Sequence, residues 1–284
     1  MLKRLWRSVL WRFRKYLLPV IRKAGALIIS PRTSIPYDFQ RAQEYWGNVP
    51  RAKGGNPFDT VRLKSLTDQE VVTEFDREGE IARQKNERRL GYVLALETLG
   101  KLENPKVMDY GCGIGFYGME ILLQHPTACV TFVDINPENL AVVQRIANAK
   151  GFADRVDFVP VRDPEARDFD SPVLYDLIVS MGVLHHTPHA AQIVHNLSNF
   201  LKPGGIFQVM LYNYHYLKET QESAGRKLSF SGFGERTDPK VGDLSNPYSE
   251  PYDDEKAQQL FQGYSMVSAD YPNPWYNTYR FRRG

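Results

Sequence analysis

The sequence predicts an α/β protein: a three-layer α-β-α sandwich around a mostly parallel seven-stranded sheet, with an antiparallel strand at its C-terminal end and a helical N-terminal extension. Between residues 105 and 212, short apolar runs alternate with amphipathic segments, which favours parallel strands covered by helices on both faces. Near the C-terminus, Pro272-Asn273-Pro274 separates the β-rich runs Tyr264–Asp270 and Tyr276–Phe281, and this spacing suits an antiparallel pair that closes the sheet.

Length and composition set the class of protein. The chain has 284 residues, enough for one large α/β domain with additions or for two small domains. Hydrophobic residues make up 42% and charged residues 24%, as in an ordinary globular protein. Cys112 and Cys129 are the only cysteines, so we expect neither a disulfide framework nor a zinc site, and a reducing, cytoplasmic compartment. No apolar run approaches the ~20 residues that span a bilayer.

Charge is distributed unevenly along the chain. The formal net charge is +3, yet residues 1–37 contain nine basic residues and no acidic one. The rest of the chain therefore has 27 basic against 33 acidic residues, a balance of about −6. Such a body does not suggest a nucleic-acid enzyme, whose binding face needs clustered Lys and Arg, so no nucleic-acid partner is expected.

The N-terminal segment, residues 1–29, has the pattern of a basic amphipathic helix. Over residues 2–23, Leu, Trp, Phe and Val recur on one side and Lys and Arg lie largely elsewhere, with Pro19 expected to kink or divide the helix. This pattern is typical of a helix lying on an anionic membrane, which makes a peripheral membrane contact the first hypothesis. A helix docked on its own domain or on a partner, and an Arg-rich transit peptide, are the alternatives.

Residues 30–104 are expected to form a helical cap on the core. Residues 30–60 are rich in Pro and Gly, with a short helix predicted over Asp38–Trp46. Thr67-Asp68-Gln69-Glu70 resembles a helix start, and a charged amphipathic helix is predicted from about Thr73 to Leu99, ending at Gly100.

The core is predicted over residues 105–212. Its expected strands are Val107–Tyr110, Cys129–Val133, Val156–Val161, Leu174–Ser180 and Ile206–Tyr212. Its expected helices are Tyr117–Gln124, Pro137–Lys150 and His189–Leu201, and Lys202-Pro203-Gly204-Gly205 reads as a tight turn into the last strand. Right-handed crossovers place the strand ends along one edge, where ligands bind. Residues 213–252 are polar and rich in turn residues, as in an insertion or lid over that edge, and residues 253–284 are expected to supply a last helix, Asp253–Gln262, and two closing strands.

A glycine turn follows the first strand of this core. The turn, in the run Asp109-Tyr110-Gly111-Cys112-Gly113-Ile114-Gly115, is too tight for side chains and lets backbone N–H groups approach a ligand. Gly113-x-Gly115-x-x-Gly118 also fits a dinucleotide fingerprint, with Asp134 about 20 residues further on, which alone is weak evidence for NAD. Asp109 favours a cationic ligand group over a pyrophosphate.

Four motifs in order make a more specific resemblance. They are Asp-Tyr-Gly-Cys-Gly-Ile-Gly (109–115), Val-Asp-Ile-Asn-Pro (133–137), Tyr-Asp-Leu-Ile-Val-Ser-Met-Gly-Val-Leu-His-His-Thr-Pro (175–188) and Leu-Lys-Pro-Gly-Gly (201–205). Together they resemble the class I S-adenosylmethionine-dependent methyltransferases, over about residues 105–212. The Gly-Val-Leu-His-His-Thr-Pro form is closest to a bacterial subgroup that acts on small molecules or glycan-like substrates. The resemblance implies a Rossmann-like fold and S-adenosyl-L-methionine as cofactor.

The resemblance also implies residue roles at the cofactor. It places the methionine part of the cofactor against the turn residues Gly111, Cys112, Gly113 and Gly115, with Asp109 facing its ammonium group. It implies that Asp134 accepts hydrogen bonds from both ribose hydroxyls and that Ile135 packs on the adenine ring. Asp163 would accept from the adenine amino group. Ser180 and Met181 would lie next to the methyl-bearing sulfur. Without the resemblance, Asp134 reads as a helix cap before Pro137, and Asp163 as a turn cap before Pro164.

Three histidines, His185, His186 and His189, follow the fourth strand. A general base is one interpretation, with His185 first, His186 second, and Tyr212 and His215 as outside candidates. Packing under the cofactor and helix capping are the other interpretation, and no metal site is expected because no further ligand set accompanies the histidines. Tyr37, Tyr45 and Trp46 either fold over the ligand or anchor irregular chain.

The function expected from these observations is methyl transfer from S-adenosylmethionine to an oxygen, nitrogen or carbon of a small-molecule, glycan or lipid-linked acceptor. Two other classes stay open at this point: an NAD-dependent oxidoreductase, and a non-catalytic binding module that retains the fold. The sequence specifies neither the acceptor nor the oligomeric state.

Overall fold

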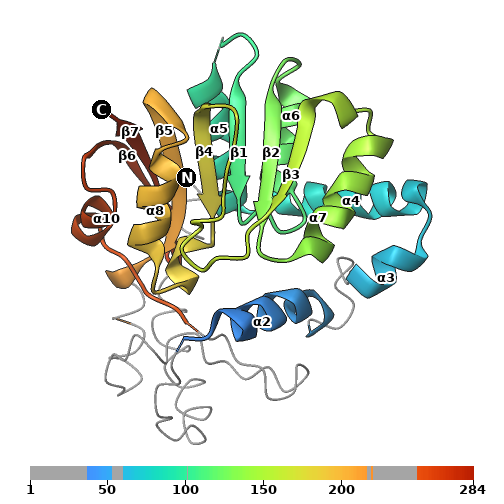
Figure 1. Ribbon diagram of the computed structural model, residues 1–284, viewed down its shortest axis with the longest axis horizontal. Helices are drawn as coiled ribbons and strands as arrows, with labels where there is room; N and C mark the ends of the chain where they lie inside the picture. The colour runs from blue at the N-terminus through green and yellow to red at the C-terminus, as the bar shows by residue number, and fades with distance from the viewer. Residues whose placement is uncertain (1–36, 53–59, 101, 216–218, 220–247) are drawn as a thin grey trace, which may run out of the picture.

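The structure is a three-layer α-β-α sandwich. This computed structural model describes residues 37–52, 60–100, 102–215, 219 and 248–284 (Figure 1). Its central sheet has seven strands in the order β3-β2-β1-β4-β5-β7-β6, which confirms the predicted fold class. The strands are β1 Lys106–Tyr110, β2 Cys129–Asp134, β3 Val156–Pro160, β4 Tyr175–Met181, β5 Leu201–Tyr212, β6 Tyr264–Asn273 and β7 Tyr276–Arg283. Strands β1 to β5 pair in parallel and β7 runs antiparallel to both of its neighbours.

Helices cover both faces of the sheet. One apolar core joins α5 (Asn86–Leu99), α6 (Phe116–Gln124) and α7 (Pro137–Ala149) to one face, with Met119 and Ile146 among its fully buried side chains. A second core joins α8 (Ala190–Ser198) and α10 (Asp254–Leu260) to the other face (Figure 1). Because α6 and α7 lie opposite α8, the chain changes direction between the adjacent strands β1 and β4. A crevice forms outside the strand ends at such a switch point.

The N-terminal helices differ from the prediction. Phe39–Ala52 is helix α2, longer than expected, and Thr60–Ser65 is α3. The single helix expected over 73–99 is wrong, because the chain forms α4, Asp68–Arg83, and then α5, broken at the extended backbone of Lys85. Thr67 begins α4 with a reciprocal capping box to Glu70, as the sequence indicated. The break separates two packing partners, since α4 lies on α7 whereas α5 lies on the sheet, and local propensity does not encode that difference.

The turn expected before the fifth strand lies inside β5. Leu201 pairs with Tyr175, and Ile206 pairs with Leu177, so four residues of β5 lie opposite one residue of β4. Gly204 in this stretch has φ +75°, the left-handed conformation that glycine accepts readily. Lys202 at the same place donates to Asp176 at 2.7 Å, which ties the irregular start of β5 to β4.

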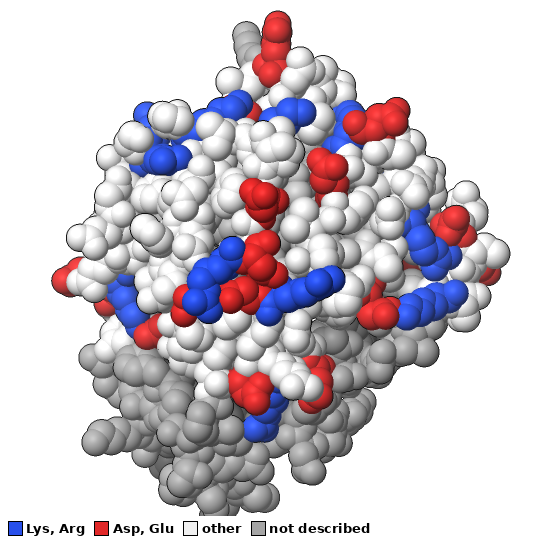
Figure 2. Space-filling model, in the orientation of Figure 1, with Lys and Arg blue, Asp and Glu red and all other residues white. Residues whose placement is uncertain are grey.

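Two predicted segments lie largely outside the described residues: the basic helix over 2–23 and most of the insertion over 213–252. Within the described ranges no helix has the length and apolarity needed to cross a membrane. On the face shown in Figure 2, acidic and basic side chains of the described residues are interspersed.

Candidate functional site

The glycine turn folds back over the end of β2. The backbone N–H groups of Gly111 and Cys112 both donate to the carbonyl of Val133, at 2.7 and 3.0 Å. Gly111 has φ +71°, and a Cβ there would lie 2.4 Å from a methyl carbon of Val183. Gly113 has φ +55°, and a Cβ there would meet no atom within 4 Å. Glycine at 111 is therefore required by packing, whereas glycine at 113 leaves bare backbone facing open space.

The later glycines of the turn have another use. Gly115 is the N-cap of α6 at φ +79°, where a Cβ would lie 2.8 Å from Val143. A Cβ on Gly118 would lie 2.3 Å from the ring of Phe132 on β2. Both positions let α6 pack closely against the sheet and α7, and Gly115 is not among the residues that line the cavity described below.

Asp134 ends β2 and holds the turn in place. One carboxylate oxygen accepts from the Gly113 N–H at 2.7 Å, and the other accepts from the Asn136 N–H at 2.8 Å and the Asn139 amide at 3.3 Å. Burial raises the pKa of Asp134 to about 6, although these three hydrogen bonds act in the opposite direction. The N-cap of α7 is Asn136 rather than Asp134, so the capping alternative does not apply to Asp134. Asn139 had no signal in the sequence.

Asp109 lies at the end of β1 and is 2% exposed. It accepts a hydrogen bond from the Gly118 N–H at 2.9 Å, in the first turn of α6. Burial, with a smaller contribution from the nearby Asp134, raises the pKa of Asp109 to about 7. Two carboxylates are thus buried on one side of the crevice, where a cationic group would favour their ionised forms.

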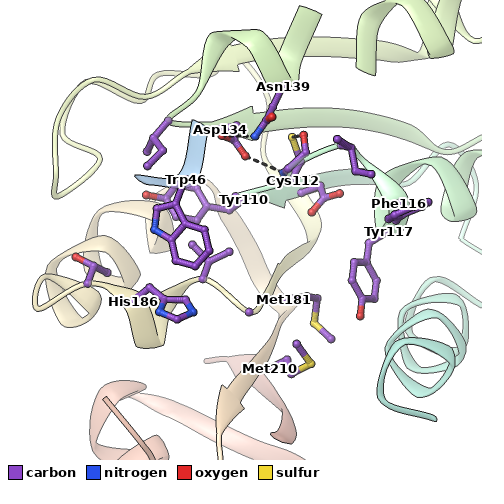
Figure 3. Close-up of a pocket in the computed structure, with 18 of the residues that line it drawn as sticks. Trp46, Tyr110, Cys112, Phe116, Tyr117, Asp134, Asn139, Met181, His186 and Met210 are labelled. Atoms are coloured by element: carbon purple, nitrogen blue, oxygen red, sulfur yellow. Dashed lines mark hydrogen bonds between the residues drawn. The ribbon is translucent and has the colours of Figure 1, made fainter. Parts of the chain in front are cut away.

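A cavity of about 530 Å³ occupies the crevice, and Figure 3 shows its lining. Asp109, Asp134 and the turn residues Gly111, Cys112 and Gly113 line its floor together with Ile135 and Met181. Helix α2 lies across this edge of the sheet (Figure 1), and Gln43 on α2 donates to the Ile135 carbonyl at 3.2 Å. Tyr37 and Trp46 also line the cavity, whereas Tyr45 packs edge-on against Trp46.

Besides Gly115, two predicted cofactor residues, Asp163 and Ser180, are not among the residues that line the cavity. Asp163 pairs with Arg167 at 3.0 Å and accepts from the Glu165 N–H, as in the turn-cap alternative. Ser180 is fully buried beneath the cavity, and its neighbour Met181 lines it. Val161 and Pro164 line the cavity near the position expected of Asp163.

His186 lines the cavity beneath Trp46, with 4.5 Å between the ring centroids (Figure 3). It belongs to the short helix η3, Leu184–His186. Its Nδ1 atom lies 3.1 Å from the carbonyl oxygen of Tyr248 and 3.1 Å from the hydroxyl of Ser249. Burial lowers the pKa of His186 to about 4, so the ring is neutral at pH 7.

His185, the first candidate for a base, is not among the cavity lining. It is 1% exposed, stacks on Tyr212 at 3.9 Å between centroids, and a ring nitrogen bonds to the backbone carbonyl of Met210. Burial, and after it the adjacent His186, lower the pKa of His185 well below its ordinary value. Tyr212 is also absent from the lining and packs between His185 and Tyr276.

The end of the insertion returns to this region. The N–H of Glu250 donates to the His185 carbonyl at 2.8 Å, and the N–H of Tyr252 donates to the Tyr212 carbonyl at 2.8 Å. The Glu250 carboxylate accepts from the hydroxyls of Tyr248 and Tyr252 and from Lys256. This segment, 248–252, is therefore fastened to η3 and to the end of β5.

Two basic side chains line the rim of the cavity and were missed by sequence reasoning. Lys85 and Arg88 flank the break between α4 and α5, with the Arg88 guanidinium 5.5 Å from the centre of the Phe116 ring. Neither pairs with a carboxylate among the residues that the structure describes. The predicted helix ran through this break, so no local pattern indicated that these two side chains would reach the cavity.

In the described part of the chain, no group of three or more His, Cys, Asp or Glu side chains is placed to hold a metal ion. His189 lies away from the pair at 185 and 186, 3.3 Å from Glu165 and edge-on to Tyr37.

Comparison with known proteins gives a family for the core. Residues 108–207 match the family described as "Methyltransferase domain". The chain is 34% identical over 133 residues to a ubiquinone biosynthesis O-methyltransferase of Klebsiella pneumoniae, covering 46% of this chain and 52% of that protein. It is 35% identical over 122 residues to the protein of the same name from Leptothrix cholodnii, covering 43% and 49%. The chain thus spans about half the length of these curated relatives.

Solved structures share the fold at low identity. A S-adenosylmethionine-dependent methyltransferase from Clostridium acetobutylicum superposes with a TM-score of 0.54 and 12% identity, covering 74% of this chain and 99% of that one. The [4+2]-cyclase SpnF superposes with a TM-score of 0.52 and 16% identity, covering 69% and 80%. Since one fold carries both a methyltransferase and a cyclase, these likenesses establish the architecture alone.

Proposed function

We propose that this protein transfers a methyl group from S-adenosylmethionine to a small-molecule acceptor, because residues 108–207 match the family described as "Methyltransferase domain". One observation carries the proposal: Asp109, Asp134 and the bare backbone at Gly113 face a single cavity. Burial raises the pKa of both carboxylates in that cavity, and a cationic ligand group would stabilise their ionised forms. S-adenosylmethionine supplies a methyl group on a cationic sulfur and also has an ammonium group.

The residues present fit this cofactor. The open space above Gly113, where a Cβ would meet nothing, gives a ligand close access to the turn. Asp134 retains acceptor capacity, since an ionised carboxylate offers about four lone-pair positions and three donors already reach it. Asp109 would hold the ammonium group, Asp134 the ribose hydroxyls and Ile135 the adenine. Arg88 or Lys85 at the rim supplies a partner for the cofactor carboxylate.

The chain contributes alignment and exclusion of water. The donor is already activated, so holding an acceptor in line with the sulfur and keeping the site dry supply most of the rate. Trp46 on helix α2 and Tyr37, which precedes the helix, cover the cavity. Met181 and Met210 line the wall at the ends of β4 and β5, where an acceptor approaches (Figure 3).

The same charges oppose the oxidoreductase alternative. A pyrophosphate would bring negative charge against the glycine turn, beside Asp109 and Asp134, and like charges in a buried site repel strongly. A non-catalytic protein would keep the cavity and bind the cofactor without transferring its methyl group. Cofactor binding and methyl transfer are therefore measured separately.

The test is calorimetric titration with S-adenosylhomocysteine. We expect binding by the native protein, and at least ~100-fold weaker binding by Asp134→Asn because both ribose contacts and the hydrogen bond to the Gly113 N–H weaken. Asp157→Asn, an exposed position on β3, is the matched control and should bind normally. Unchanged affinity in Asp134→Asn, or tighter binding of NADH than of S-adenosylhomocysteine by the native protein, would contradict the proposal.

The acceptor is best identified from cell extract. Extract of the source cells, incubated with the protein and isotopically methyl-labelled cofactor, should yield labelled small molecules on mass spectrometry. Glycan and lipid-linked acceptors are distinguishable there by mass and by extraction into organic solvent. Absence of labelled product, with S-adenosylhomocysteine binding intact, would favour the non-catalytic alternative.

A membrane contact is a separate proposal that rests on the sequence pattern of residues 2–23, which lie outside the described residues. We expect the 284-residue protein to sediment with vesicles containing anionic lipid, and a variant lacking residues 1–23 to stay in the supernatant. Equal sedimentation of the two proteins would remove this proposal and leave the catalytic one intact.

A further inference from the structure

A row of side chains crosses the sheet at the cavity wall formed by two methionines. Met181 on β4 pairs with Met210 on β5. Thr278 on β7 pairs with Met210 on one side and with Asp270 of β6 on the other. Because paired residues of neighbouring strands point to the same face of a sheet, these four side chains share one face. Met181 and Met210 line the cavity (Figure 3), so the row leads from the cavity wall to Thr278 and Asp270.

The far end of this row has buried oxygen atoms without hydrogen-bond partners. The Thr278 side chain is fully buried, and its Oγ1 atom has no partner among the described residues. The same is true of the buried Oδ2 atom of Asp270, on the directly opposite residue. Opposite residues of an antiparallel pair have Cβ atoms about 5 Å apart, so the two side chains are neighbours although these oxygens do not bond to each other. Native proteins leave few buried polar atoms unpaired, so two neighbouring ones indicate a place where a further group binds.

Gln208 adds a third oxygen on the same face of the sheet. It is fully buried and lies two residues before Met210 on β5. Its amide nitrogen donates to the Gly91 carbonyl at 2.9 Å and lies 3.8 Å from the Met181 sulfur, whereas its Oε1 atom has no partner among the described residues. The three residues with unpaired oxygens form an oxygen cluster: Asp270, Thr278 and Gln208.

The oxygen cluster has a negative charge that the nearest arginine on this face does not neutralise. Arg280 lies two residues after Thr278 on β7. It donates to the Ser268 hydroxyl at 2.9 Å and pairs with Glu97 at 3.0 Å. The guanidinium group is therefore engaged elsewhere, while Asp270 keeps a buried oxygen without a donor. A cationic donor would stabilise that carboxylate.

Met210 separates the oxygen cluster from the cavity and is flexible. It is 8% exposed at the cavity wall, whereas Thr278 beside it is fully buried. A Met side chain has three rotatable bonds and adapts to what it contacts. The terminal methyl of Met210 also lies beside Gly182, where a Cβ would approach it to 3.3 Å, so glycine leaves it room. We expect a change of the Met210 rotamer to open a path from the cavity to the cluster.

We propose that the oxygen cluster is a subsite for the acceptor and binds an amino group of that molecule; this inference rests on the proposed methyl transfer. A primary ammonium group has three N–H donors and a positive charge, which matches three acceptor oxygens, one of them in a carboxylate. A hydroxyl has only one donor, and a carboxylate has none and would meet the charge of Asp270. An ammonium group has no lone pair, so the methylated atom is a different one, on the part of the acceptor that stays in the cavity.

The subsite is tested first with a small amine, without cofactor or acceptor. Protein labelled with ¹³C at the methionine methyl groups is titrated with benzylamine, and Met181→Leu and Met210→Leu assign the two signals. We expect benzylamine to shift the Met210 signal and to bind at least ~10-fold more tightly than benzyl alcohol or benzoate. No shift with benzylamine, or equal affinity for the alcohol or the carboxylate, would overturn the proposal.

Variants of the oxygen cluster locate this binding. Thr278→Val and Asp270→Asn should each weaken benzylamine binding at least ~10-fold, whereas Thr278→Ser keeps the hydroxyl and should bind within about 2-fold of native. Thr278→Val should remain folded, because it removes a buried hydroxyl that has no partner. Asp157→Asn, at an exposed position on β3, is the matched control and should bind normally. Benzylamine affinity that neither Thr278→Val nor Asp270→Asn changes would mean that water satisfies these oxygens, and would overturn the proposal.

The connection with methyl transfer is tested in cell extract. Thr278→Val should lower label transfer at least ~10-fold while S-adenosylhomocysteine affinity stays within about 2-fold of native, because the oxygen cluster lies outside the proposed cofactor contacts. The labelled product should be retained on a cation exchanger and should lose that retention after acetylation of its amino group. A labelled product without an amino group would overturn the subsite and leave the proposed function intact. Failure of the native protein to bind S-adenosylhomocysteine would instead refute the proposed function.

Discussion

The two halves of the crevice are built in different ways. The half formed by β1, the glycine turn and β2 comes from residues 106–134, whose hydrogen bonds are largely local, such as Gly113 to Asp134. The half around His186 draws on α2, η3, the end of β5 and residues 248–252, which lie far apart in the chain. A site for a ligand common to a family can be encoded in one stretch, whereas a site for a particular acceptor is assembled from variable segments.

The largest effect should come from breaking the first half at Gly111. A Cβ at Gly111 would lie 2.4 Å from Val183 and would also force a left-handed residue, so Gly111→Ala should destabilise the fold by about 3 kcal/mol or more. Gly113→Ala has open space and should lose only about 1 kcal/mol, from backbone strain. Thermal unfolding of the two variants measures the contrast, and equal loss in both would show that Val183 does not define the turn.

Gly151→Ala is a matched control for Gly113→Ala. Gly151, after α7, has φ +76° and equally open space, yet it lies outside the cavity. Gly113→Ala and Gly151→Ala should be similarly stable, but only Gly113→Ala should weaken binding of S-adenosylhomocysteine, by ~10-fold or more. Equal binding by both variants would mean that a ligand does not approach Gly113.

The buried carboxylates should make the ligand-free protein less stable as pH rises. Asp109 has a pKa of about 7 in the fold against its ordinary 3.8, so between about pH 4 and pH 7 the folded state binds more protons than the unfolded state. Stability contributed by neutral Asp109 is complete below pH 4 and is lost as pH rises through 7. Asp109→Asn removes this dependence and should be more stable than native at pH 8, on the order of 2 kcal/mol.

Denaturant unfolding of native protein and Asp109→Asn at pH 5 and pH 8 checks this prediction. The other titrating groups are common to both proteins, so their contributions cancel in the difference. A native protein that gains stability relative to the variant between these pH values would contradict the pKa direction.

A smaller effect is expected from loosening the second half. The Glu250 carboxylate accepts hydrogen bonds from the hydroxyls of Tyr248 and Tyr252 and from the ammonium of Lys256. These bonds fix the segment that orients His186. Glu250→Gln should lower label transfer about 10-fold while S-adenosylhomocysteine affinity stays within 2-fold, because only the acceptor half shifts. Glu255→Gln, on the exposed side of α10, is the control. A matched loss of binding and transfer in Glu250→Gln would mean that the two halves are not separable.

The sequence predicts the first half well for a physical reason. A strand, a turn that needs glycine and a strand-ending carboxylate are local features, so the sequence alone predicts that Asp109, Gly111, Gly113 and Asp134 lie together. Residues such as Asn139, Arg88 and Thr187 have no local signature, because only the tertiary fold brings them to the cavity. The break at Lys85 is of the same kind, since helix-forming residues surround it.

The sequence pattern does not tell which of the two adjacent histidines lies at the cavity. His185 and His186 are neighbours in an identical local sequence setting, and the residue names do not say which ring meets the cavity. The backbone direction in η3 places the His186 ring at the cavity, whereas the His185 ring bonds to the Met210 carbonyl. Likewise Asp163 fitted a cofactor contact on resemblance, whereas in the fold Arg167 engages its carboxylate.

Proton release on ligand binding tests the central claim most directly. If the ammonium group of S-adenosylhomocysteine lies against Asp109, binding near pH 6.5 must ionise a carboxyl group that is largely neutral in the free protein. Calorimetric titration in buffers of different ionisation enthalpy should show release of about half a proton or more per ligand by native protein and markedly less by Asp109→Asn. Binding without proton release, or with proton uptake, would contradict a cationic ligand group at this carboxylate.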